Sequence, residues 1–121
     1  MAMILLGVFV CTKKLIDLKN CKKYIYHVNF KLFMTGNLIN HFYNSKYYSL
    51  KYKNYFPIYE TLFSRFIDKE IVFVEIGVLS GGSLFMWRRF FGNKARIIGI
   101  DLNNEAKKFE KYGFEIGRAH V

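Results

Sequence analysis

Residues 71–101 read IVFVEIGVLSGGSLFMWRRFFGNKARIIGID, and this stretch decides the fold. It opens at residues 71–76 with a β-branched run in which polar residues do not alternate with apolar ones. Such a run is typical of a central parallel strand that is buried on both faces. Residues 77–82 follow as a glycine-bearing turn.

A helix and a second strand complete this stretch. Residues 83–91 have helical spacing, with three large apolar side chains directed inward: Leu84, Trp87 and Phe91. Residues 95–100 form a second strand of the buried type, and Asp101 ends it. The order strand, turn, helix, strand predicts the first unit of an α/β, Rossmann-like, doubly wound parallel sheet.

Helices are expected before this unit. From residue 37 the spacing of apolar residues becomes helical, and residues 54–67 predict a second helix. Its apolar stripe consists of Tyr55, Ile58, Leu62 and Phe66, and it is widened by Tyr59 and Phe63. Residues 45–53, which are polar and rich in tyrosine, are expected to form a loop. We therefore divide the chain into an uncertain extension (1–36), a helical segment (37–69) and the start of the sheet domain (70–114).

The candidate site is a set of positions around the turn. Glu75 ends the first strand and Asp101 ends the second, 20 residues after Gly81. Glycines in the turn allow a ligand to approach the backbone, and the helix directs N–H groups towards the carboxyl ends of the strands. Asp101 stands where an acid can accept hydrogen bonds from both hydroxyls of a ribose.

The pattern favours a nucleotide without phosphate groups. Dinucleotide-binding turns need a middle glycine so that the pyrophosphate touches the backbone, and here that position is Leu79. Glu75 adds a negative charge beneath the turn, which a diphosphate would not tolerate well. A ligand with a cationic amino-acid group, such as S-adenosylmethionine, suits these residues better.

Three motifs carry a resemblance to a known family: EIGVLSGGSLFMW at 75–87, FG at 91–92 and IIGID at 97–101. Together they resemble a branch of the class I (Rossmann-like) methyltransferases. This branch includes the macrolide-sugar (demethylmacrocin-type) O-methyltransferases and cephalosporin hydroxylase-like proteins. The tyrosine-rich YFPIYE at residues 55–60 is similar to the helix that precedes the core in that group, and the resemblance covers about residues 38–114.

Carried over residue by residue, the resemblance implies that five residues bind S-adenosylmethionine: Glu75, Gly77, Gly81, Ser83 and Asp101. Asp101 would bind the ribose, and Met86 would line the same pocket. Leu79 departs from the general methyltransferase pattern, in which glycine is common there.

The resemblance implies O-methyl transfer to a hydroxyl of a sugar or other small molecule. In the sugar-modifying members, later acids and a histidine hold a divalent metal, and we find no counterpart of these residues here. We therefore assign no catalytic residue and no metal ligand, and expect the sheet to be truncated after its second strand. We expect an inactive N-terminal fragment of a cytoplasmic enzyme with a small-molecule acceptor, and homo-oligomer formation remains open.

Other functions also remain open. One is a hydroxylase-like enzyme of natural-product metabolism with the same fold. Another is a basic, aromatic-rich module that binds nucleic acid or a membrane surface, because the net charge is +10 and residues 1–60 carry +7 of it. The lysines are scattered and no nucleic-acid module accompanies them, so we expect neither nucleic acid nor membrane as a partner.

Both ends of the chain carry expectations of their own. Met34 is a candidate for the authentic start, which would make residues 1–33 translated upstream sequence. Residues 115–121 can be back-translated into a widely used sequencing adapter, so we expect native sequence to end near Phe114 or Glu115. Because sheet edges and one sheet face would be open, we expect the isolated chain to be unstable and to aggregate.

Overall fold

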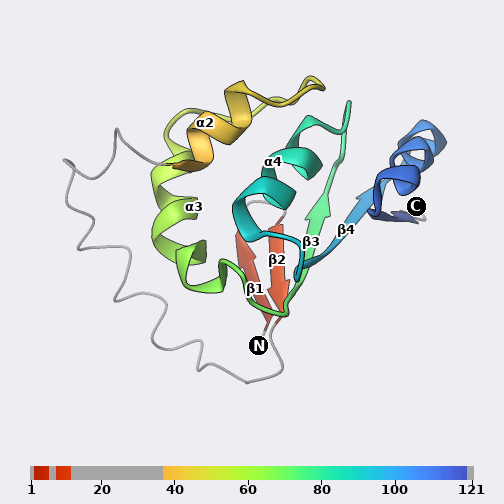
Figure 1. Ribbon diagram of the computed structural model, residues 1–121. Helices are drawn as coiled ribbons and strands as arrows, with labels where there is room; N and C mark the ends of the chain where they lie inside the picture. The colour runs from red at the N-terminus through yellow and green to blue at the C-terminus, as the bar shows by residue number, and fades with distance from the viewer. Residues whose placement is uncertain (1, 6–7, 12–36, 120–121) are drawn as a thin grey trace.

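The computed structural model describes residues 2–5, 8–11 and 37–119, and it is built around one sheet (Figure 1). The strand order is β1-β2-β3-β4-β5. The strands are β1 (Ala2–Leu5), β2 (Val8–Cys11), β3 (Val72–Ile76), β4 (Arg96–Asp101) and β5 (Glu115–Arg118).

Within residues 37–119, three α-helices and two 3₁₀ helices accompany the sheet. The α-helices are α2 (Asn37–Tyr43), α3 (Tyr55–Phe63) and α4 (Gly82–Phe91). The short 3₁₀ helix η3 (Ser64–Phe66) extends α3, and the longer η4 (Asn104–Tyr112) lies between β4 and β5.

The predicted strand–turn–helix–strand path is confirmed. β3 leads through the turn into α4, and β4 then pairs with β3 in parallel, with Glu75 opposite Gly99. The Gly77 N–H continues this ladder beyond the strand by donating to the Ile100 carbonyl at 2.8 Å. The α/β class is therefore established by three parallel strands, β3, β4 and β5.

Two parts of the predicted architecture are wrong. The parallel sheet is not truncated after its second strand, because β5 pairs with β4 in parallel at residues 115–118. The sheet is also not preceded only by helices, since β1 and β2 pair antiparallel with each other and β2 pairs antiparallel with β3. β5 lies within residues 115–121, which we expected to be adapter sequence outside the native fold. β1 and β2 have only four residues each, too few for a periodic pattern to reveal them.

An aromatic core packs between β3 and the helices. Trp87, Phe73 and Phe91 are fully buried, and the Phe73 ring centroid lies 4.6 Å from that of Trp87 and 4.9 Å from that of Phe91. The inward orientation predicted for Leu84, Trp87 and Phe91 is confirmed. Aromatic pairs of this geometry stabilise a core beyond the area that they bury.

The buried face of α3 agrees with the predicted stripe in part. Its buried residues are Phe56, Tyr59, Leu62 and Phe63, whereas Tyr55 and Ile58 are only half-buried. Tyr59 and Phe63, which were expected at the edge of the stripe, lie at its centre because their rings both pack against Trp87. The pattern alone could not distinguish the centre of the stripe from its edge, since apolar residues occupy both.

The two faces of the parallel strands are covered unequally, which differs from the predicted burial on both faces. Along β3, Phe73 and Glu75 are buried under α4, while Val72 and Val74 on the other face are half-buried. Ile76, at the end of that second face, is 50% exposed. Among the described residues, the helices therefore protect mainly one face.

Two further expectations concern membrane spans and the start of the native chain. None of the helices in the described ranges combines the length and apolar character needed to cross a bilayer. Residues 12–36, which include Met34, lie outside the described residues, so the predicted start of the native chain stays a prediction.

We predict that Ile97→Val lowers the free energy of unfolding more than Ile76→Val does. Ile97 is 1% exposed on the helix-covered face, so removing one methylene should lower the free energy of unfolding by about 1 kcal/mol. Ile76 is half exposed, so the same change there should cost less than about 0.5 kcal/mol. Urea denaturation of both variants measures the difference, and equal costs would contradict the one-sided core.

Candidate functional site

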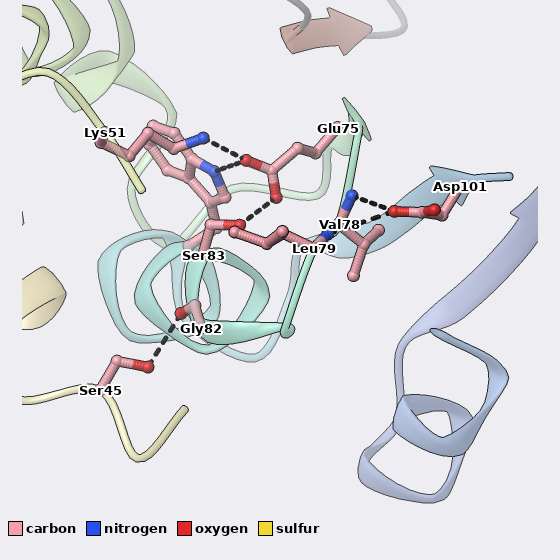
Figure 2. A network of polar contacts seen from close by, with 9 residues as sticks. Ser45, Lys51, Glu75, Val78, Leu79, Gly82, Ser83 and Asp101 are labelled. Carbon is pink, nitrogen blue, oxygen red and sulfur yellow. Dashed lines mark hydrogen bonds and ion pairs between the residues drawn. The ribbon is translucent and has the colours of Figure 1, made fainter. Parts of the chain in front are cut away.

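Glu75 and Asp101 lie on the same face of the sheet, at the carboxyl ends of adjacent parallel strands (Figure 2). Residues paired across a parallel ladder project to one face, and Glu75 is paired with Gly99, two residues before Asp101. The turn at residues 77–82 connects β3 to α4 next to both carboxylates. Both acids therefore lie at the edge of the sheet where the sequence predicted them, and their role in binding a cofactor stays a prediction.

The Asp101 carboxylate holds the turn. Its Oδ2 accepts hydrogen bonds from the backbone N–H groups of Val78 at 2.7 Å and Leu79 at 3.2 Å, and its Oδ1 accepts from Asn103 N–H at 2.8 Å. Partial burial opposes ionisation, but the hydrogen bonds from backbone amides outweigh it and lower the pKa of Asp101. Asp101 is therefore an ionised carboxylate at neutral pH, and it joins the end of β4 to the turn.

Glu75 lies beneath the turn and is 1% exposed. Its Oε1 accepts from Lys51 Nζ at 2.6 Å and from the indole Nε1 of Trp87 at 3.3 Å, while its Oε2 accepts from Ser83 Oγ at 2.6 Å. Burial of a carboxylate is tolerated only when it is paired and hydrogen-bonded in this way. Ser83, a predicted cofactor residue, thus points at Glu75, and the predicted pocket residue Met86 is fully buried in the core.

Sequence reasoning missed Lys51. It lies 24 residues before its partner Glu75, in a stretch predicted to be a loop, and no local spacing connects the two. Its positive charge neutralises the carboxylate that we expected to repel a diphosphate. The charge of Glu75 alone therefore does not exclude a diphosphate in this structure.

Lys51 belongs to a segment that covers the start of α4, and we call residues 45–51 the strap. Ser45 Oγ donates to the Gly82 carbonyl at 2.9 Å, and the Tyr48 carbonyl accepts the Gly82 N–H at 3.1 Å. Just before the strap, the Asn44 carbonyl accepts from Arg89 of α4 at 2.9 Å. The strap is therefore attached to the first residue of α4 through Ser45 and Tyr48, and to β3 through Lys51.

The glycines of the turn serve different purposes. A Cβ at Gly82 would collide with the carbonyl of Tyr47 in the strap, and one at Gly81 would collide with the ring of Phe109. Both Gly77 and Gly81 have positive φ angles, 84° and 82°, but a Cβ at Gly77 would meet no atom within 4 Å. Gly77 is therefore the predicted turn glycine that leaves space for a ligand.

Leu79 also has a left-handed backbone, with φ 51°, and its side chain is 60% exposed. Glycine adopts this conformation readily, whereas a side chain with a Cβ is strained in it. The turn therefore holds Leu79 in a backbone conformation that glycine would adopt more easily.

The turn is not an open phosphate cradle. A phosphate-binding turn needs free N–H groups directed at the anion. Here five N–H groups of residues 77–82 donate to acceptors within the protein: those of Gly77, Val78, Leu79, Gly81 and Gly82. Two of the five are held by the Asp101 carboxylate, which occupies the place of an external anion.

The described residues form no metal site, and comparison with known proteins gives no match. In residues 2–5, 8–11 and 37–119, no three His, Cys, Asp or Glu side chains gather as a metal site would require. Comparison with protein-family models, with curated proteins and with solved structures finds no match for this chain.

We predict that Asp101→Asn destabilises the fold in a pH-dependent manner. The pKa of Asp101 is lowered by folding from its ordinary value of 3.8, so its stabilisation is present above that value and is lost as the pH falls through the lower folded pKa. The difference in unfolding free energy between wild type and variant should be largest near pH 7 and shrink below about pH 3.8. Urea denaturation across pH measures it, with Glu110→Gln, at an exposed acid, as the control. A difference that does not change with pH would contradict the assignment.

A second prediction concerns the ion pair. Lys51→Met leaves the Glu75 carboxylate buried without its cation, which should cost about 3 kcal/mol of unfolding free energy. The double variant Lys51→Met/Glu75→Gln removes both charges and should be more stable than Lys51→Met alone. Lys53→Met, at an exposed lysine two residues away, should change stability by less than about 0.5 kcal/mol. If Lys51→Met behaved like Lys53→Met, the pair would have no structural role.

Proposed function

We propose that this chain is the cofactor-binding, N-terminal part of an S-adenosylmethionine-dependent methyltransferase that transfers a methyl group to a hydroxyl of a sugar or other small molecule. One observation carries the proposal: an ionised carboxylate, Asp101, meets a left-handed turn with open space at Gly77, at the carboxyl ends of two parallel strands. In open α/β sheets this edge is where nucleotide ligands bind.

Asp101 is suited to hold a ribose. Each carboxylate oxygen accepts two hydrogen bonds, and Oδ2 already accepts two from the turn. Oδ1 accepts one, from Asn103 N–H, so it has capacity for a hydroxyl donor. The same carboxylate that shapes the turn would thereby bind the nucleoside.

The donor and acceptor balance of the turn favours a ligand without phosphate. The N–H groups that a diphosphate would need are already engaged, and Asp101 would repel it. S-adenosylmethionine has no phosphate, and its charged groups include two cations, the sulfonium and the ammonium. These cations fit a site that contains the carboxylates of Glu75 and Asp101.

S-adenosylmethionine supplies a methyl group on a cationic sulfur, which an oxygen nucleophile attacks in line. The residues of this chain would contribute binding and orientation, which lower the barrier by fixing the donor relative to the acceptor. No described residue is assigned as the acid, base or metal ligand of the transfer.

Calorimetric titration with S-adenosylmethionine at pH 7 tests the proposal. We expect saturable binding, reduced by about tenfold or more in Asp101→Ala because hydrogen bonds to a charged group are lost. Glu110→Ala, at an exposed acid of η4, should leave the affinity unchanged. Because Asp101 also holds the turn, the melting temperature of each variant is measured alongside.

Two results would contradict the proposal. One is the absence of S-adenosylmethionine binding to a folded wild-type protein, and the other is equally tight binding of ATP. Salt-sensitive RNA binding without affinity for S-adenosylmethionine would instead favour the basic binding module.

A further inference from the structure

The Lys51–Glu75 ion pair is a pair of opposite charges held at one side of the turn (Figure 2). The Lys51 ammonium contacts the Glu75 carboxylate at 2.6 Å, and the two side chains are 14% and 2% exposed. Glu75 lies two residues before Gly77, whose Cβ position opens onto free space. The pair is therefore close in the sequence to a turn position that has open space beside its backbone.

We propose that this pair recognises the amino-acid end of the cofactor by opening around it, so that Glu75 binds the α-ammonium and Lys51 binds the α-carboxylate. This inference rests on the proposed function and deepens it. It assigns a binding role to Lys51, for which neither the motifs nor the resemblance gave a signal.

Charge complementarity carries the inference. An α-amino acid is a zwitterion, and insertion between a lysine and a glutamate gives each of the four charges an opposite partner. A ligand with only one of these charges would leave Lys51 or Glu75 without a partner in a nearly buried position, which is costly. The pair thus selects for a ligand that carries both charges.

Glu75 is held more firmly than Lys51, so the ion pair between them can open by movement of the lysine. Glu75 is fixed by two neutral donors of α4, Ser83 and Trp87, which keep its carboxylate in place when the lysine leaves. Lys51 stands at the end of the strap on a long flexible side chain, and its neighbours Leu50 and Tyr52 are largely exposed to solvent. The lysine can therefore move while the carboxylate stays.

The test compares three ligands by calorimetry: S-adenosylmethionine, its decarboxylated form and 5′-methylthioadenosine. The second ligand lacks the carboxylate, and the third has neither the ammonium nor the carboxylate. Wild-type protein should bind S-adenosylmethionine about tenfold more tightly than the decarboxylated form, as expected for one charge-assisted contact. In Lys51→Met this ratio should fall to about one, while Lys53→Met should keep the wild-type ratio.

Glu75→Gln completes the test. It should weaken both ammonium-bearing ligands about tenfold and leave the affinity for 5′-methylthioadenosine unchanged. Binding of 5′-methylthioadenosine also reports whether each variant retains a folded nucleoside site. If Lys51→Met no longer binds 5′-methylthioadenosine, the inference is judged by the wild-type protein alone, from the ratio of its affinities for S-adenosylmethionine and the decarboxylated form.

The inference and the proposed function fail in different ways. A wild-type ratio near one, or an unchanged ratio in a folded Lys51→Met protein, would overturn the role of the pair while S-adenosylmethionine still binds. If wild type binds neither S-adenosylmethionine nor 5′-methylthioadenosine, the proposed function itself is wrong and the inference falls with it.

Discussion

The structure depends on the buried Glu75 carboxylate and the three donors that satisfy it. Two donors, Ser83 and Trp87, come from α4, and the third, Lys51, comes from the strap. This single charge therefore connects β3, the first turns of α4 and a segment 24 residues earlier in the sequence. Because an unsatisfied carboxylate is very unfavourable inside a protein, the three elements are held in one arrangement.

A second carboxylate, Asp101, sets what the turn can bind. It accepts the N–H groups of Val78 and Leu79, so backbone donors that could hold a phosphate are already in use. Leu79 keeps a left-handed backbone despite its side chain, and the hydrogen bond to Asp101 helps to fix that conformation. The result is a turn whose charge is negative and whose open space lies at Gly77.

The sequence predicted the β3–α4–β4 path and the convergence of Glu75 and Asp101, because both follow from local patterns and the parallel order of strands. It could not predict Lys51, since that contact depends on how a distant segment crosses α4. It also missed β5, because residues 115–121 were expected to be adapter sequence, and it missed the antiparallel hairpin of β1 and β2, whose strands are too short for a period to be recognised. The sequence also could not explain why residues 81 and 82 are glycines. A Cβ at Gly81 would collide with Phe109 and one at Gly82 with Tyr47, and both of these residues come from other segments of the chain.

The most direct measurement of the central claim is an NMR titration of the ¹⁵N-labelled protein with S-adenosylmethionine. The account predicts saturable shifts that are largest at the amides of Gly77, Val78 and Leu79 and at Asp101, with little change at the exposed Lys107 and Lys108 of η4. Shifts that are absent from the turn, or that are spread over the exposed lysines instead, would contradict it.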